Sequence, residues 1–137
     1  MKEKKKVLIV DDDKSQIIAI FQMLNGQFEV IAANSGAEAL ELVDKGIQPD
    51  LIILDILMPE MDGWSTFNKL KAISSISDVP IAFLTSLIGE TEEKYASEIG
   101  AADFITKPFQ KNDLMQRIEN ILKNNIKNND IDYYVIN

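Results

Sequence analysis

The sequence contains neither cysteine nor histidine. The absence of cysteine excludes disulfides, thiolate metal sites and cysteine nucleophiles. The absence of histidine excludes serine–histidine–aspartate triads, histidine-ligated zinc and catalysis by an imidazole acid or base. Any chemistry of this chain must therefore use carboxylates, hydroxyls, lysines, the backbone or a hard metal ion.

Basic residues are scarce as well, with 14 lysines and arginines against 22 aspartates and glutamates, and the net charge is -8. This balance argues against a protein that wraps nucleic acid with a broad basic surface, so we expect no direct binding of nucleic acid. No apolar run approaches the roughly 18 residues of a membrane span, and no signal peptide is recognisable. We therefore expect a cytoplasmic protein without a membrane partner, whose 137 residues are enough for one domain with a sizeable core.

Short apolar runs alternate with helical patterns along the chain. Runs rich in valine, isoleucine and phenylalanine predict five strands, over residues 7–10, 28–33, 51–54, 81–84 and 103–105. The first, third and fourth are continuously apolar, which is typical of strands covered by helices on both faces. Strand–helix alternation repeated five times predicts an α/β fold with a doubly wound parallel sheet.

Apolar residues at helical spacing lie between these runs. The patterns comprise Ile17, Ile18, Phe21 and Leu24; Leu40 and Val43; Trp64, Phe67 and Leu70; Tyr95, Ala96 and Ile99; and Leu114, Ile118, Ile121 and Leu122. Ser35 and Glu38 predict a capping box that opens the second helix. Gly26, Gly46 and Gly100 predict the ends of the first, second and fourth helices.

The last segment, from Lys123 to Asn137, changes from asparagine-rich to apolar and aromatic at Tyr133 and Tyr134. One interpretation is a frayed helix end followed by a linker. Another is the start of an output domain, or a segment that pairs with a partner. We accordingly divide the chain into a domain over residues 1–124 and a C-terminal tail, or start of a linker to an absent output domain, over residues 125–137.

Polar residues stand at the carboxyl ends of four predicted strands. They are Asp11 and Asp12 after the first strand, Asp55 after the third, Thr85 and Ser86 at the fourth and Lys107 at the fifth. Because the carboxyl ends of parallel strands meet at one rim of a sheet, we expect these groups to converge. Taken singly, each has an ordinary structural explanation, such as a helix cap, a strand residue or a solvated charge. Capping accounts for Asp13, with Gln16 at the third helical position, but it does not account for the whole set.

Carboxylates that lie together at one rim repel each other, and this repulsion must be offset. Two of them about 4 Å apart repel by roughly 4 kcal/mol at an effective dielectric constant of 20, so a proton, a lysine or a metal ion must offset the charge. Oxygen ligands without nitrogen or sulfur suit Mg²⁺, Mn²⁺ or Ca²⁺, and three carboxylates plus waters favour Mg²⁺, with Mn²⁺ possible. A magnesium ion beside an aspartate, a lysine and a hydroxyl suits phosphoryl transfer to a carboxylate. Neither a GxxxxGK[ST] loop nor a GxGxxG fingerprint is present.

Four motifs, in order along the chain, carry a resemblance to a known family. They are LIVDDD at 8–13, LIILDILMPEMDG at 51–63, IAFLTS at 81–86 and DFITKPF at 103–109. With these motifs the sequence resembles the receiver domain of two-component response regulators, of the chemotaxis-receiver type, from about residue 6 to residue 123. The resemblance implies a flavodoxin-like (βα)₅ fold with strand order 2-1-3-4-5.

The resemblance also implies roles at the rim. Asp55 would be the phosphoacceptor and would form an acyl phosphate. Asp11 and Asp12 would hold Mg²⁺ together with Asp55 and the backbone carbonyl of Leu57. Lys107 would pair with the phosphoryl group.

Further implied roles concern the switch. Thr85 would move to hydrogen-bond a phosphoryl oxygen, and the small Ser86 would leave the approach open. The peptide between Lys107 and Pro108 would be cis. The family couples the threonine to an aromatic residue on the fifth strand, which is Phe104 here. Because phenylalanine has no hydroxyl, any inward rotation would be driven by packing alone.

Such a domain would be a phosphorylation-activated switch, with self-phosphorylation and slow autodephosphorylation but no enzymatic turnover. Its donor would be a histidine kinase or a histidine phosphotransfer protein. Because the sequence lacks histidine, the phosphohistidine must belong to another protein or to a chain segment not present here. The signal would pass through the face of the fourth helix, fifth strand and fifth helix to a downstream protein or output domain, with a phosphorylation-dependent dimer as one possible result. Two alternatives remain: an aspartate-nucleophile phosphohydrolase, which needs an acid–base carboxylate where Leu57 stands, and a degenerate receiver that only binds partners.

Overall fold

The computed structural model describes the backbone of residues 3–87 and 89–136, and the side chains of these residues up to 125. In this part of the chain, five parallel strands form one sheet in the order β2-β1-β3-β4-β5. Their bounds are Lys6–Val10 for β1, Glu29–Ala33 for β2, Leu51–Leu54 for β3, Ile81–Thr85 for β4 and Asp103–Thr106 for β5. The predicted α/β class and strand order are confirmed.

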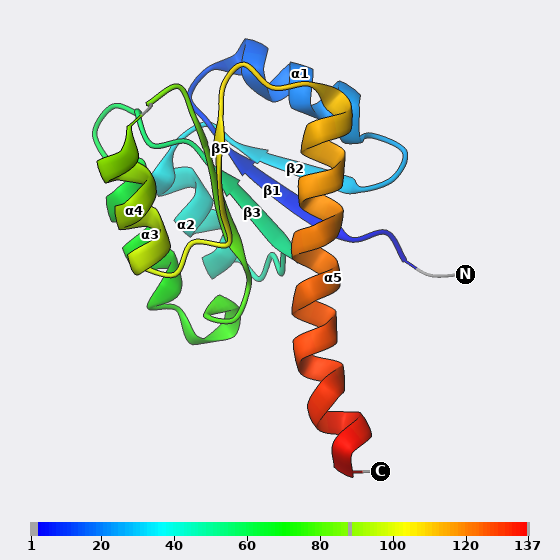
Figure 1. Ribbon diagram of the computed structural model, residues 1–137. Coiled ribbons are helices and arrows are strands. Elements are labelled where there is room, and N and C mark those ends of the chain that lie inside the picture. The colour runs from blue at the N-terminus through cyan, green and yellow to red at the C-terminus, as the bar shows by residue number, and fades with distance from the viewer. Residues whose placement is uncertain (1–2, 88, 137) are drawn as a thin grey trace.

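Helices cover both faces of this sheet (Figure 1). Their bounds are Lys14–Leu24 for α1, Gly36–Asp44 for α2, Gly63–Lys71 for α3, Glu90–Glu98 for α4 and Lys111–Ile136 for α5, with a 3-10 turn, η1, at Ser74–Ile76. Helices α1 and α5 pack on one face, and α2, α3 and α4 pack on the other. The structure is therefore a three-layer, doubly wound fold.

Alternate residues of the central strands supply two separate cores. On β1, Val7 and Ile9 face α1 and α5, whereas Leu8 and Val10 face α2, α3 and α4. All four side chains are buried. Since a fully buried valine, leucine or isoleucine contributes about 1.5–3 kcal/mol, the two cores hold the strand ends in fixed positions.

The first helix corrects one part of the predicted pattern. Ile18 is 56% exposed and Phe21 is 43% exposed, whereas Ile20 and Leu24 are fully buried against the sheet. Residues 20 and 24 lie one turn apart on the same helical face. The pattern that identified the helix therefore included two residues that face solvent.

Side chains begin the helices as predicted. Asp13 accepts hydrogen bonds from the Ser15 and Gln16 backbone N–H groups at the start of α1. Ser35 accepts from the Glu38 N–H at the start of α2, although the Glu38 carboxylate accepts from the N–H of residue 34 and not from that of Ser35. Asp62 caps α3 by accepting a hydrogen bond from the Ser65 N–H.

The fifth helix is longer than predicted. It continues to Ile136, and its last turns project beyond the edge of the sheet (Figure 1). The side chains after residue 125, including Tyr133 and Tyr134, lie outside the described residues, so the linker and partner-pairing interpretations of this segment stay predictions. Among the residues that the structure describes, no helix has the length and apolarity needed to cross a membrane.

Candidate functional site

Strand pairing brings the predicted rim residues together. Asp11 and Asp55 directly follow β1 and β3, whose last residues, Val10 and Leu54, are paired in register. The Asp55 N–H donates to the Val10 carbonyl at 2.9 Å, which fixes the two chain ends side by side. On the neighbouring strands, the Lys107 N–H donates to the carbonyl of Thr85, also at 2.9 Å.

Three carboxylates form the centre of this rim. Asp11, Asp12 and Asp55 each offer one oxygen, and these oxygens all lie within 4.8 Å of one another. Asp11 and Asp55 are buried, whereas Asp12 is exposed. A cluster of oxygen donors with an open side suits a hard divalent cation that keeps part of its hydration shell, such as Mg²⁺ or Mn²⁺.

The two oxygens of the Asp55 carboxylate have different surroundings. Oδ1 accepts a hydrogen bond from the Ile56 N–H at 2.8 Å, while Oδ2 lies 3.6 Å from the Lys107 ammonium. Burial and the nearby charge of Asp11 raise the pKa of the Asp55 carboxyl, although Lys107, the Thr85 hydroxyl and the Ile56 N–H act in the opposite direction. The backbone therefore orients this carboxylate and leaves Oδ2 toward the cationic side of the site.

Lys107 bridges the two buried carboxylates. Its Nζ lies 2.9 Å from Asp11 Oδ2 and 3.6 Å from Asp55 Oδ2, and its side chain is only 16% exposed. The other Asp11 oxygen accepts from the Asp13 N–H at 3.0 Å. The predicted cis peptide between Lys107 and Pro108 is present. One ammonium thus offsets part of the repulsion within the acidic cluster.

The remaining predicted residues surround the carboxylates. Thr85 is fully buried, and its hydroxyl accepts a hydrogen bond from the Leu87 N–H at 3.1 Å. Ser86, next to it, is exposed. Leu57 is 54% exposed between two buried neighbours, Ile56 and Met58. Its side chain therefore points away from the core, and the role of its carbonyl as a metal ligand stays a prediction.

An aromatic cluster beside the site was not predicted as a unit. The half-buried Phe104 of β5 packs against Phe83 of β4, with ring centroids 6.4 Å apart. Phe83 also contacts Trp64 at 4.8 Å and Phe67 at 5.4 Å, both on α3, and Trp64 meets Tyr95 of α4 edge-on at 4.9 Å. In the sequence these aromatics appear only as separate helical or strand patterns, and nothing in their spacing shows that they meet.

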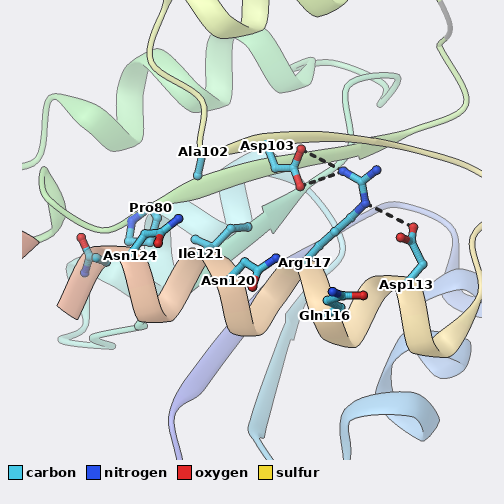
Figure 2. Close-up of a pocket in the computed structure, with 10 residues that line it drawn as sticks. Pro80, Ala102, Asp103, Asp113, Gln116, Arg117, Asn120, Ile121 and Asn124 are labelled. Carbon is cyan, nitrogen blue, oxygen red and sulfur yellow. Dashed lines mark hydrogen bonds and ion pairs between the residues drawn. The ribbon is translucent and has the colours of Figure 1, made fainter. Parts of the chain in front are cut away.

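A second polar feature lies between β5 and α5, away from the carboxylates (Figure 2). The Arg117 Nη1 donates to both Asp103 oxygens at 3.0 and 2.9 Å, and its Nε donates to Asp113 at 3.2 Å. The hydrogen bonds that Arg117 donates to Asp103 raise the pKa of Arg117. A groove of about 640 Å³ follows this ion pair along α5. The pair joins the edge strand to the last helix.

Comparison with models of protein families shows to which family the chain belongs. The model of the response regulator receiver domain matches residues 7–119. The chain belongs to this family. Receiver domains are signalling domains of two-component systems, so the predicted identity is confirmed.

Individual relatives agree with this assignment. The chain is 40% identical over 124 residues to a protein of Pyropia yezoensis named "Probable transcriptional regulator ycf27", and the match covers 88% of the chain and 49% of that protein. It is 36% identical over 126 residues to histidine kinase P4 of Formosa agariphila, covering 92% of the chain and 9% of the kinase. The chain therefore spans about half the length of the first relative and a small part of the second.

Among solved structures, the chain resembles the chemotaxis protein CheY4 of Vibrio cholerae. The TM-score is 0.81 at 29% identity, and the match covers 87% of the chain and 99% of CheY4. The receiver fold thus accounts for the three layers and for the position of the acidic rim at the carboxyl ends of the strands.

Proposed function

We propose that this receiver domain accepts a phosphoryl group on Asp55 from the phosphohistidine of a histidine kinase or a histidine phosphotransfer protein. The observation that carries the proposal is the orientation of the Asp55 carboxylate, with Oδ1 held by the Ile56 N–H and Oδ2 turned toward Lys107. In the reaction, an Asp55 oxygen attacks phosphorus while the phosphorus–nitrogen bond to the donor breaks. The bonding pair leaves with the imidazole nitrogen, and an acyl phosphate results.

Asp11, Asp12 and Asp55 would hold the Mg²⁺ ion of this reaction, and Mn²⁺ would fit the same oxygen donors. The ion would neutralise charge on the phosphoryl oxygens and help to orient them. The carbonyl of Leu57 would be a further ligand. Burial and the charge of Asp11 raise the pKa of Asp55 although Lys107 lowers it, and a bound cation would favour the ionised carboxylate.

Lys107 and Thr85 would respond to the new phosphoryl group. The Lys107 ammonium would exchange part of its interaction with Asp11 for a phosphoryl oxygen. The Thr85 hydroxyl accepts from the Leu87 N–H and lowers the pKa of Asp55, so its own proton would turn from the carboxylate to the phosphoryl group. Exposed Ser86 would leave the donor an open approach.

The phosphorylated state would be favoured by these additional bonds, which shift the population between two arrangements of the domain. The change would pass through α4, β5 and α5, with Phe104 moving by packing alone. It would reach a downstream protein, an attached output domain or a second phosphorylated copy. The domain would promote its own phosphorylation and slow dephosphorylation without further turnover.

Intact-mass spectrometry tests the phosphoacceptor. We expect incubation with acetyl phosphate and Mg²⁺ to add one phosphoryl group, and Asp55→Asn to abolish the addition. Asp13→Asn is the matched control, because it removes a neighbouring carboxylate that caps α1 and should leave labelling intact. Equal labelling of the Asp55 variant and the wild type would contradict the proposal.

A further inference from the structure

Gly63, the buried first residue of α3, lies against the backbone of the predicted phosphoacceptor. A Cβ atom added at this position would contact the Asp55 carbonyl oxygen and would lie 2.6 Å from Ile56 Cα and 2.9 Å from the Asp55 carbonyl carbon. All three are backbone atoms, so no side-chain rotation could relieve the overlap. Any other residue here would have to displace the peptide that joins Asp55 to Ile56.

That peptide also orients the Asp55 carboxylate. The Ile56 carbonyl accepts hydrogen bonds from the Gly63 N–H at 2.8 Å and from the Met58 N–H at 3.1 Å. The N–H of the same residue, Ile56, belongs to the Asp55–Ile56 peptide and donates to Asp55 Oδ1 at 2.8 Å. Hydrogen bonds through Ile56 therefore connect the start of α3 with the Asp55 carboxylate.

We propose that Gly63, besides allowing close packing, is a positioning residue that holds the Asp55 carboxylate in place for phosphorylation. Its missing side chain allows α3 to lie directly on the Asp55–Ile56 peptide, so that the Ile56 N–H fixes Oδ1 and leaves Oδ2 facing Lys107. This inference rests on the proposed function of Asp55. In-line attack is sensitive to such placement, because a shift of the reacting group by about 1 Å can cost about 100-fold in rate.

Gly36 provides a matched control at the start of the adjacent helix α2. It too is buried, and an added Cβ would contact the Thr66 hydroxyl oxygen and lie 3.0 Å from the Met61 sulfur. These are side-chain atoms of α3 and of the loop that precedes it, not backbone atoms of Asp55. Gly36→Ala therefore strains neighbouring packing without pushing on the phosphoacceptor.

The experiment compares Gly63→Ala, Gly36→Ala and wild type, each shown by circular dichroism to be folded. The rate of labelling by acetyl phosphate is measured over a series of Mg²⁺ concentrations. For Gly63→Ala we expect the maximal rate to fall by about 10- to 100-fold, with a much smaller change in the Mg²⁺ concentration that gives half the maximal rate. For Gly36→Ala we expect the wild-type maximal rate. If Gly63→Ala is only partly folded, the rates are measured in sucrose, which favours the compact state, and expressed per folded molecule.

Hydrogen exchange of the Ile56 amide gives a second readout that does not depend on phosphorylation. We expect faster exchange in Gly63→Ala and unchanged exchange in Gly36→Ala. Wild-type rates of labelling and exchange in Gly63→Ala, or equal slowing of labelling in both variants, would overturn the inference. If the wild type itself is not labelled, the proposed function fails, whereas the exchange comparison still decides whether Gly63 holds the Ile56 N–H in place.

Discussion

Replacing Lys107 with methionine tests whether this lysine offsets the negative charge of Asp11 and Asp55. The Lys107 ammonium lies 2.9 Å from Asp11 Oδ2 and 3.6 Å from Asp55 Oδ2. At an effective dielectric constant of about 20, these attractions amount to about 5.7 and about 4.6 kcal/mol before the cost of removing the charges from water. Removing one partner of a buried ion pair costs about 3–5 kcal/mol in net stability. We therefore expect Lys107→Met to lower the free energy of unfolding in EDTA by about 3 kcal/mol.

Magnesium should change this difference. The substitution removes a positive charge that would repel the ion and frees Asp11 Oδ2, so the variant should bind Mg²⁺ at least about tenfold more tightly, which corresponds to about 1.4 kcal/mol. A ligand that binds only the folded state stabilises it by RT ln(1 + [L]/Kd). The stability gap between variant and wild type should thus narrow as the Mg²⁺ concentration rises.

Urea unfolding in EDTA and at several Mg²⁺ concentrations provides the measurement. Lys94→Met is the control, because Lys94 is an exposed residue of α4 and its loss changes the net charge equally. Equal stability of Lys107→Met and wild type in EDTA would refute the assignment of Lys107 as the compensating charge. The same conclusion would follow if Mg²⁺ raised the free energy of unfolding of both proteins by the same amount. The related variant Lys107→Ala should lose much of the phosphate-induced conformational response without losing Mg²⁺ affinity, because the ammonium competes with the ion for Asp11 and Asp55. The opposite result would reverse the proposed roles.

Three other perturbations have expected outcomes. In EDTA the folded protein should hold the Asp55 proton more tightly than the unfolded chain, whose carboxyl has the ordinary pKa of 3.8. Stability should then fall as pH rises from 3.8 through the raised pKa, and urea titrations of Asp55→Asn should lack this decline. Asp13→Ala should lower the free energy of unfolding through loss of the α1 cap, and a variant as stable as the wild type in urea would argue against that cap. Arg117→Met should cost no more than about 1 kcal/mol in thermal unfolding, since solvent screens its pair with Asp103; a larger loss would show that the pair stabilises the domain more than a surface ion pair does.

The sheet and its acidic rim could be predicted because both follow from local patterns. Continuous apolar runs marked the central strands, and parallel pairing then forced their carboxyl ends to one side. Asp11, Asp55 and Lys107 needed no further information to be brought together. The Asp13 cap was equally predictable, because its hydrogen bonds reach only two or three residues along the chain.

Burial on the first helix was less predictable. Successive helical residues are turned by about 100°, so Ile18 and Phe21 cannot share one narrow face with Ile20 and Leu24. Apolar side chains occupy several faces of α1, and the sequence does not show which of them meets the sheet. The packing of α1 against the sheet and α5 selects Ile20 and Leu24.

The backbone network around Ile56 was also missed, because a close approach between two backbones leaves little trace in residue patterns. One signal was present. Glycine costs about 1 kcal/mol relative to alanine within a helix, yet Gly63 stands at the first position of α3 directly after the Asp62 cap. A glycine at the start of a helix is one sign of a close backbone contact, and the structure shows such a contact at Gly63.

The aromatic cluster bears on how a receiver could switch when its fifth-strand aromatic residue is Phe104, which has no hydroxyl. Phe104 pairs in register with Phe83, which precedes Thr85 by two residues on the same strand. An aromatic contact contributes about 0.5–1.5 kcal/mol beyond area burial, and two conformations of a protein commonly differ by a few kcal/mol. Repacking of Phe104 against Phe83, together with the Trp64 and Tyr95 contacts, is therefore large enough to help couple the proposed Thr85 movement to α4. A hydroxyl on residue 104 would not be required for that coupling.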